Sequence, residues 1–118
     1  MVINSYKDLI VWQKSFALAK NIYELTASLP KNELYGLSSQ VQRCAVSIPS
    51  NIAEGQQRNH IKEYRHFIGI AKGSAAELET QLLLISDIYG INCDNQIGIL
   101  NKIQKMLTAL IKRLEPNN

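Results

Sequence analysis

The chain has 118 residues, of which 46% are hydrophobic and 19% charged, and its formal net charge is +3. This length suits one domain, and the composition excludes an intrinsically disordered chain. Six glycines, three prolines and β-branched residues that do not alternate with polar ones disfavour an all-β fold. We therefore expect one all-α domain over residues 1–118, an up-down-up-down antiparallel four-helix bundle.

The first expected helix covers about residues 7–28 and has two apolar stripes at steps of three and four residues. Ser5 is its expected N-cap, with Asp8 three residues further on, and Pro30 prevents its continuation. One stripe consists of Leu9, Trp12, Phe16, Ala19 and Tyr23, and the other of Val11, Leu18, Ile22, Leu25 and Leu29.

The second expected helix, about residues 34–54, contains a proline in the middle of its apolar pattern. In a helix Pro49 cannot donate a hydrogen bond to the carbonyl of Ala45, and its ring presses against that carbonyl, at a cost of about 3 kcal/mol. We favour a continuous helix that is kinked at Pro49. The alternative is a true break followed by one short turn.

Polar residues around Pro49 support either interpretation. In a kinked helix Ser47, Ser50 or Asn51 supplies hydrogen bonds near the bend, whereas in a broken one Asn51 and Glu54 form a capping box. Asn51 and Glu54 are the expected hydrogen-bonding support of the kink. Gly55 is expected to close this helix in the left-handed conformation.

The third and fourth expected helices cover about residues 60–89 and 94–114. Asn59 or His60 begins the third and Gly90 ends it, while Asp94 caps the fourth and Pro116 stops it. Both have apolar residues at heptad steps, which is typical of a helix wound against partners. The two seams are Tyr64, Ile68, Ala71, Ala75, Leu78, Leu82, Ile85 and Tyr89, and then Leu100, Ile103, Leu107, Leu110 and Leu114.

The chain has more apolar residues than one bundle core requires, because a single core needs one face of each helix. Besides the second stripe of the first helix, the surplus comprises Ile70, Leu83, Leu84, Ile88, Ile99, Met106 and Ile111. We therefore expect a homo-oligomer. The alternative is partial burial at the edges of the core.

The residues that could carry catalysis or bind a metal do not form a recognisable site. The only histidines, His60 and His66, lie in no local nucleophile signature, and there is no glycine-rich phosphate loop. Gly69 and Gly73 are four residues apart in mid-helix and with Ala76 form a small-residue face that another helix can approach closely.

A di-iron centre needs Glu-x-x-His on two helices and a further Glu on each of the others, but Glu63 and His66 supply the motif once. We therefore expect that the protein is not an enzyme and that it binds neither a metal ion nor a cofactor. The two cysteines, Cys44 and Cys93, have no metal-ligand spacing and are expected to be buried free thiols.

The location of the protein is expected to be cytoplasmic. Free thiols indicate a reducing compartment, and the N-terminus lacks the basic start and apolar core of a signal peptide. No uncharged apolar run approaches the roughly 20 residues that span a bilayer, so no membrane contact is expected.

Positive charge is concentrated in two stretches, residues 58–72 and 102–113. Such patches attract polyanions, although solvated helix faces have the same composition. The first stretch lacks interleaved exposed aromatic residues that stack on single strands, since Tyr64 and Phe67 are expected to be buried. The candidate nucleic-acid-binding residues are Arg43, Arg58, Lys62, Arg65 and Lys72.

The chain resembles the four-helix-bundle family encoded within intervening sequences of bacterial 23S rRNA genes. The most specific run is Ser47-Ile-Pro49-Ser-Asn51-Ile-Ala-Glu54-Gly55. The similarity extends to Tyr6-Lys-Asp-Leu-x-Val-Trp-Gln13, Tyr35-Gly-Leu-x-x-Gln40 with Arg43, Tyr64-Arg-x-Phe67, and Ala71-x-Gly-Ser-x-x-Glu-Leu-Glu-Thr80.

This resemblance implies a left-handed up-and-down bundle, often assembled as a ring-like pentamer. It also implies kinship with the accessory protein of diversity-generating retroelements, a basic pentameric barrel that binds nucleic acid and a reverse transcriptase. It supplies no catalytic residues. We expect a non-enzymatic oligomer that binds RNA or DNA through basic patches, and the alternative is a protein-interaction scaffold without a nucleic-acid role.

Overall fold

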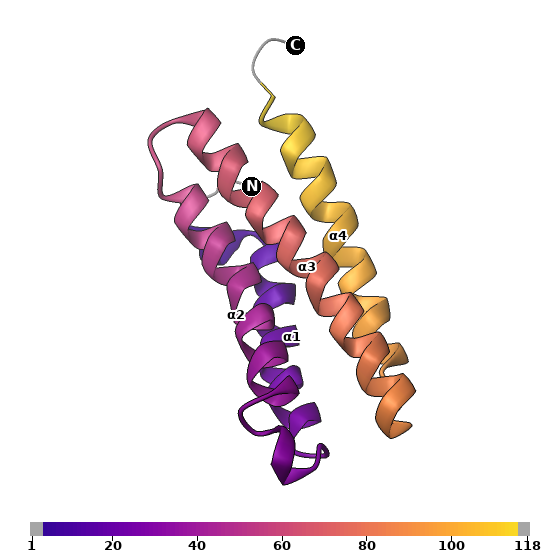
Figure 1. Cartoon of the computed structure of the whole chain (residues 1–118). Helices are drawn as coiled ribbons and strands as arrows, with labels where there is room; N and C mark the ends of the chain where they lie inside the picture. Colours follow the sequence, from indigo (N-terminus) through magenta and orange to yellow (C-terminus); the bar gives the residue numbers. More distant parts are fainter. Residues whose placement is uncertain (1–3, 116–118) are drawn as a thin grey trace.

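The computed structural model describes residues 4–115, and these form an all-α four-helix bundle, as predicted. Its helices are α1 (Ile10–Thr26), α2 (Leu37–Gln56), α3 (Ile61–Tyr89) and α4 (Asp94–Arg113), shown in Figure 1. Two 3₁₀ turns, η1 (Tyr6–Asp8) and η2 (Lys31–Glu33), precede α1 and α2, and the described part of the chain contains no strand. The bundle measures 48 × 23 × 20 Å.

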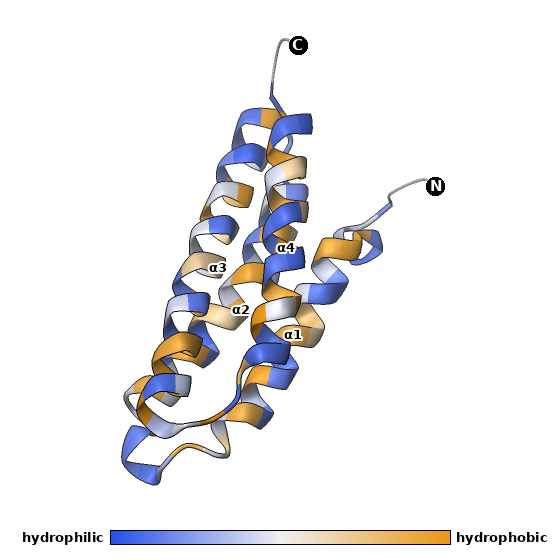
Figure 2. Ribbon diagram, turned by 90° about the vertical axis from the view of Figure 1, so that its right-hand side faces the viewer, coloured by the Kyte–Doolittle hydropathy of each residue, from blue (hydrophilic) through white to orange (hydrophobic). Residues whose placement is uncertain are grey.

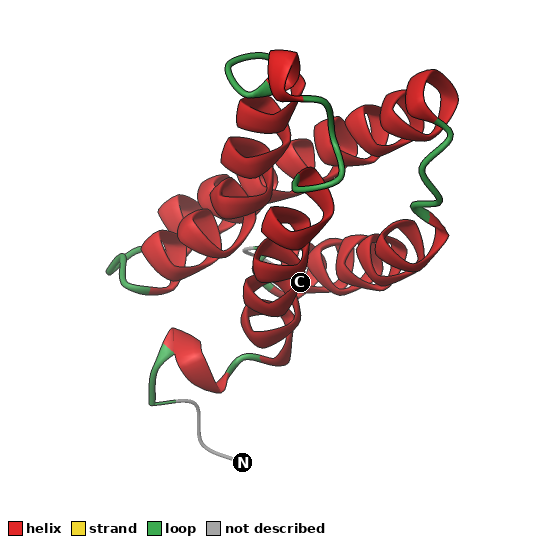
Figure 3. Cartoon of the chain, turned by 90° about the horizontal axis from the view of Figure 1, so that it is seen from below, coloured by secondary structure: helices red, strands yellow, loops and turns green. Residues whose placement is uncertain are grey.

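Each helix packs against two others, α1 on α2 and α4, and α3 on α2 and α4 (Figure 3). Hydrogen bonds between sequence-distant side chains show that neighbours run antiparallel. Gln42 at the start of α2 donates to Thr26 at the end of α1, over 2.9 Å. Gln96 near the start of α4 donates to Asn21 near the end of α1, over 2.7 Å.

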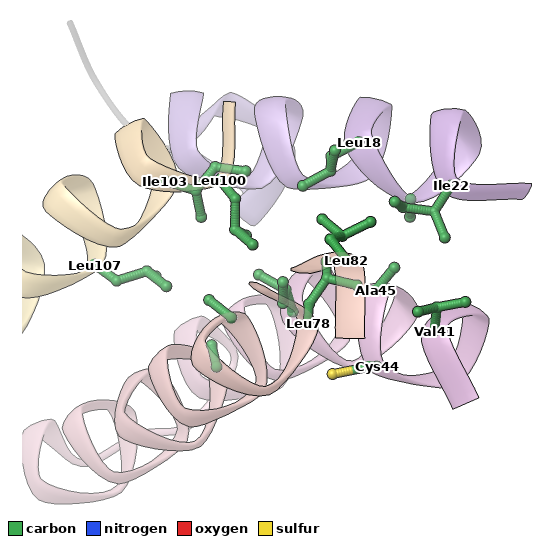
Figure 4. Close-up of a cluster of buried hydrophobic side chains, with 14 of the residues drawn as sticks. Leu18, Ile22, Val41, Cys44, Ala45, Leu78, Leu82, Leu100, Ile103 and Leu107 are labelled. Carbon is green, nitrogen blue, oxygen red and sulfur yellow. The ribbon is translucent and has the colours of Figure 1, made fainter. Parts of the chain in front are cut away.

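The core is built from one side of each helix, and Figure 2 shows how apolar and polar residues alternate along every helix. The predicted heptad seams are confirmed. In α3 the six seam residues between Tyr64 and Tyr89 are fully buried, and so are Leu100, Ile103 and Leu107 of α4. Figure 4 shows part of this cluster, including Leu18 and Ile22 of α1, Val41 and Ala45 of α2, and Leu78 and Leu82 of α3.

The two apolar stripes of α1 have different environments. Val11, Leu18 and Ile22 of one stripe enter the core. In the other stripe, Phe16 is 47% exposed and Tyr23 is 51% exposed. The surplus of apolar residues therefore leaves part of α1 uncovered within one copy of the chain.

Several helix ends differ from the sequence prediction. Ser5 caps η1 by accepting from the amide of Lys7, and α1 itself begins at Ile10. Asp94 is the first residue of α4 and not its cap, and the side chain of Asn92 accepts from the Asp94 amide over 2.8 Å. Gly90 ends α3, as predicted, and the structure shows it in the left-handed conformation, with φ of 67°. Pro116 lies outside the described residues.

Helix α2 continues through Pro49. The prediction of a continuous helix is therefore confirmed, and the alternative of a break at Pro49 is excluded. The side-chain amide of Asn51 donates to the backbone carbonyl oxygen of Ser47 over 2.8 Å and to the Ser47 hydroxyl over 2.9 Å. This side chain supports the proline turn as expected. Glu54 does not, because it is exposed and pairs with Arg58 at 2.7 Å.

The prediction that Gly55 closes α2 in the left-handed conformation is wrong. Gly55 is a helical residue, and among the described residues only Gly90 is a glycine with positive φ. A Cβ at position 55 would lie 2.9 Å from Cβ of Phe67 and 3.1 Å from the carbonyl oxygen of Tyr64. The residue is glycine because α3 crosses α2 too closely there for any side chain.

Gly69 and Gly73 do not have this role within the chain. A Cβ at either position would meet no atom within 4 Å, and both residues are exposed. The close helix approach expected at this face is therefore not made by another helix of the same described bundle.

Candidate nucleic-acid interface

A surface groove between α3 and α4 contains the main basic cluster of the described chain. Its lining residues are Lys62, Arg65, His66, Gly69 and Ile70 from α3 and Ile111 from α4. Lys112 and Arg113 follow Ile111 at the end of α4 and are exposed. The groove thus combines cationic side chains with two isoleucines.

Helical periodicity places three of the five candidate cations on one face of α3. Lys62, Arg65 and Lys72 are separated by three and seven residues, which correspond to about one and two turns. They extend over about 15 Å of the helix, since each residue rises 1.5 Å. Lys62 and Lys72 are exposed, and Arg65 is half-buried.

Contacts between α3 and α4 position this face. The guanidinium of Arg65 lies 3.8 Å from the carboxylate of Glu115. The side-chain amide of Gln104 donates to the backbone carbonyl of Lys72 over 3.4 Å, and Lys72 is exposed. The Nε atom of Arg65 is buried and has no partner among the described residues.

Arg58 lies close to this cluster but is held by two carboxylates. Its guanidinium is 2.7 Å from Glu54 and 3.7 Å from Glu63, and it lies over the ring of Phe67 at 4.8 Å. A phosphate would have to compete with both glutamates for this cation. Arg58 therefore connects the loop after α2 to the start of α3.

The structure does not bring Arg43 together with the other four candidates. Arg43 lies on the α2–α3 side of the bundle, in a polar pocket that also contains the carboxylate of Glu77. The basic groove is on the α3–α4 side of α3. Arg43 thus belongs to a second surface.

No exposed Phe, Tyr or Trp side chain lines the basic groove in the described residues. Tyr64 and Phe67 were predicted to be buried, and the structure leaves both half-buried. Burial raises the pKa of the Tyr64 phenol, and the nearby Arg113 partly opposes that shift. The face offers charge to a polyanion and little surface for base stacking.

An apolar groove on the α1–α2 side is the second prominent surface feature. Trp12 stacks on Phe16 with ring centroids 4.9 Å apart, and Tyr6 meets Trp12 edge-on at 5.3 Å. The groove is lined by Tyr6, Trp12, Phe16, Ala19, Lys20, Tyr23, Val46, Pro49, Ser50 and Ala53. The sequence signal for it was the outer stripe of α1, but its α2 wall depends on tertiary packing.

The cysteines are buried free thiols, as expected. Cys44 donates to the carbonyl oxygen of Ser74 over 3.0 Å. Burial, with a smaller effect of the Glu77 charge, raises the pKa of this thiol to about 12. Burial also raises the pKa of Cys93. Neither thiol is activated as a nucleophile, since activation requires a lowered pKa.

Residues 4–115 contain no cluster of three or more His, Cys, Asp or Glu side chains that could hold a metal ion. In the same residues, no helix combines the length and apolar character needed to cross a membrane.

The family model for 23S rRNA-intervening sequence proteins matches residues 7–112. The chain belongs to this family. A crystal structure of a protein with unknown function from the S23 ribosomal protein family of Bacteroides thetaiotaomicron is 26% identical and superposes with a TM-score of 0.78. The match covers 87% of this chain and 99% of that one. A comparison with curated proteins gives no significant match.

Proposed function

We propose that this family member is a non-enzymatic, oligomeric helical bundle that binds the backbone of RNA or DNA through the α3–α4 groove. The observation that carries the proposal is the alignment of Lys62, Arg65 and Lys72 along one face of α3, beside the basic end of α4. Such cations bind phosphates without reading sequence.

The composition of the groove favours backbone contacts over base recognition. Single-strand binding without sequence preference usually combines a cationic groove with aromatic platforms, and no exposed Phe, Tyr or Trp side chain lines this one. Arg58 contributes less because two carboxylates hold it, and Arg43 because it lies on the α2–α3 side of the bundle. Arg65 remains in the groove, although the Glu115 carboxylate lies 3.8 Å from its guanidinium. The binding should therefore weaken steeply as salt rises.

Self-association would multiply these contacts. The half-exposed Phe16 and Tyr23 leave about 100 Å² of aromatic surface each, since such side chains present 150–250 Å². Val46 and the partly buried Trp12 extend the same surface. We propose that a second copy covers the α1–α2 groove, and a ring-like pentamer is the assembly that the resemblance implies.

Titration of fluorescent duplex RNA and duplex DNA at about 50 and 200 mM salt tests the binding. Replacing Lys62 and Lys72 together by alanine should weaken binding to both and reduce the slope of log K against log salt by about two, one for each lost phosphate contact. Lys31→Ala, in η2 and outside the groove, is the matched control and should leave the slope unchanged. Equal binding by the double variant and the wild type would refute the assignment.

A protein-interaction scaffold without a nucleic-acid role is the second candidate, and the apolar α1–α2 groove favours it. Light scattering after size exclusion should show an oligomer for the wild type and a smaller species for Phe16→Glu. A monomeric wild type at micromolar concentration would exclude self-association, and absence of binding to either duplex at low salt would exclude the first candidate.

A further inference from the structure

His66 lines the basic groove between α3 and α4 but is not among the cations that carry the proposed binding. It shares the groove with Lys62 and Arg65, the two positively charged residues that line it. His66 is exposed, and its ring meets the ring of Phe67 edge-on, with centroids 5.5 Å apart. The imidazole is therefore open to solvent on the surface where a phosphate backbone is proposed to bind.

The neighbours of His66 along α3 leave its ring accessible. Residues three and four positions away on a helix lie beside one another, and for His66 these are Lys62, Glu63, Gly69 and Ile70. Gly69 has no side chain, and even a Cβ there would meet no atom within 4 Å. In the described part of the chain, no hydrogen bond or ion pair engages the two ring nitrogens of His66. Both nitrogens can therefore contact a ligand in the groove.

Among the described residues, no carboxylate lines the groove beside His66. The carboxylates of this region lie close to arginines. Glu54 and Glu63 are 2.7 and 3.7 Å from Arg58, and Glu115 is 3.8 Å from Arg65. The charged groups around His66 are Lys62, Glu63, Arg65 and Lys72 on α3, Lys112, Arg113 and Glu115 at and after the end of α4, and Glu54 and Arg58 at and after the end of α2. A positive charge on His66 would thus be added to a surface that is already cationic.

A fall in pH would change the charge of this groove at His66. A histidine side chain in water is mostly neutral at pH 7.5 and mostly charged at pH 5.5. Ordinary lysine, arginine and carboxyl side chains keep their charges over this range, and so do the phosphodiesters of a duplex. The charged imidazole donates from both nitrogens, and such charge-assisted hydrogen bonds to phosphate are stronger than those from a neutral donor.

We propose that His66 makes nucleic-acid binding by the α3–α4 groove pH-dependent, because its protonation adds a phosphate contact beside Lys62 and Arg65. The inference rests on the proposed function and adds its regulation. A bound phosphate favours the charged imidazole, so binding near pH 6.5 should take up protons. An exposed ion pair of this kind strengthens binding about two- to fivefold. The slope of log K against log salt should also become steeper by about one at pH 5.5.

Titration of a fluorescent DNA duplex at about 50 mM salt, at pH 7.5 and at pH 5.5, tests this inference. The wild type should bind about two- to fivefold more tightly at pH 5.5. His66→Gln should have the same affinity at both pH values. His66→Lys, which is charged at both, should also lose the pH dependence but bind more tightly than His66→Gln. Calorimetry at pH 6.5 in two buffers of different ionisation enthalpy should detect proton uptake by the wild type and none by His66→Gln.

His60→Gln is the matched control, because His60 is the other histidine of the chain, is exposed and does not line the groove. It should keep the wild-type pH dependence, and circular dichroism should show a folded bundle for every variant at both pH values. Binding that needs Lys62 and Lys72 but has one affinity at both pH values would overturn this inference alone. Absence of binding at both would overturn the proposed function with it. A pH dependence that persists in His66→Gln or disappears in His60→Gln would also overturn the inference.

Discussion

Replacing Gly55 by alanine tests the close approach of α2 and α3 at this position. The added methyl group would lie 2.9 Å from Cβ of Phe67, 3.1 Å from the Tyr64 carbonyl oxygen and 3.2 Å from the Tyr64 ring. Two of these three atoms are rigidly tied to the α3 backbone, so no rotamer change can remove the clash. Either α3 moves away from α2, or the end of α2 distorts.

The expected loss combines two opposing effects. Overpacking a close contact reduces the free energy of unfolding by about 1–3 kcal/mol. Alanine is favoured over glycine in a helix by up to about 1 kcal/mol, and this gain is smaller near the last turn of α2. The net loss should be about 1–2 kcal/mol, which lowers the melting temperature by about 4–8 °C per kcal/mol for a domain near this size.

Urea unfolding followed by circular dichroism at one fixed protein concentration measures this difference, since assembly makes stability concentration-dependent. Gly98→Ala in α4 is the matched control, because a Cβ there would meet no atom within 4 Å. It should raise stability by about 0.5–1 kcal/mol. Equal stability gains for Gly55→Ala and Gly98→Ala would show that the close approach of α2 and α3 is not what excludes a side chain at position 55.

Three further measurements follow from the structure. Pro49→Ala should preserve or raise stability in urea unfolding, because α2 is already continuous and the variant regains the amide that can donate to Ala45; a loss above about 2 kcal/mol would instead mean that proline is required for packing or assembly. Hydrogen bonds from Tyr89 and then from the Leu37 amide lower the pKa of the Glu33 carboxyl below its ordinary 4.5, so this stabilisation is present above pH 4.5 and is lost as the pH falls through the lowered value. Acid titrations should therefore show a smaller loss of stability for Glu33→Gln than for the wild type, and equal losses would contradict the role of Glu33. With a pKa of about 12 for Cys44 and burial of both thiols, a disulfide reagent near pH 8 should label neither cysteine in the native protein and both in concentrated guanidinium; fast labelling of the native protein would be inconsistent with the buried thiols.

The parts of the fold that depend on periodicity could be predicted from the sequence. The seams of α3 and α4 repeat over several heptads, so each seam residue between Ile68 and Ile85 was correctly placed in the core. The two stripes of α1 were also recognised, but periodicity alone could not determine which one the other helices cover. That choice depends on the positions of α2 and α4 around α1.

The errors concern residues whose role depends on what lies across from them. Gly55 has the sequence context of a helix cap, and only the position of Phe67 shows that it is a packing glycine. Arg43 and Arg58 were grouped with Lys62 by charge, although Glu77 and Glu54 lie beside them in the fold. Glu54 stands four residues before Arg58, a spacing that the sequence shows, whereas the position of Glu77 beside Arg43 depends on how α2 packs on α3.

Residues 47–55, the run around Pro49 that carries the most specific family similarity, contact different neighbours of α2. Ser47 bonds to Ser74 beside the polar pocket on the α3 side, while Pro49 lines the apolar groove on the α1 side. Gly55, two turns further on, lies in close contact with α3. A segment that shapes both outer seams of one helix has an architectural role, and none of these three residues lines the basic groove between α3 and α4. Its specificity as a family signature is therefore explained by packing on two sides of α2, without requiring a catalytic function.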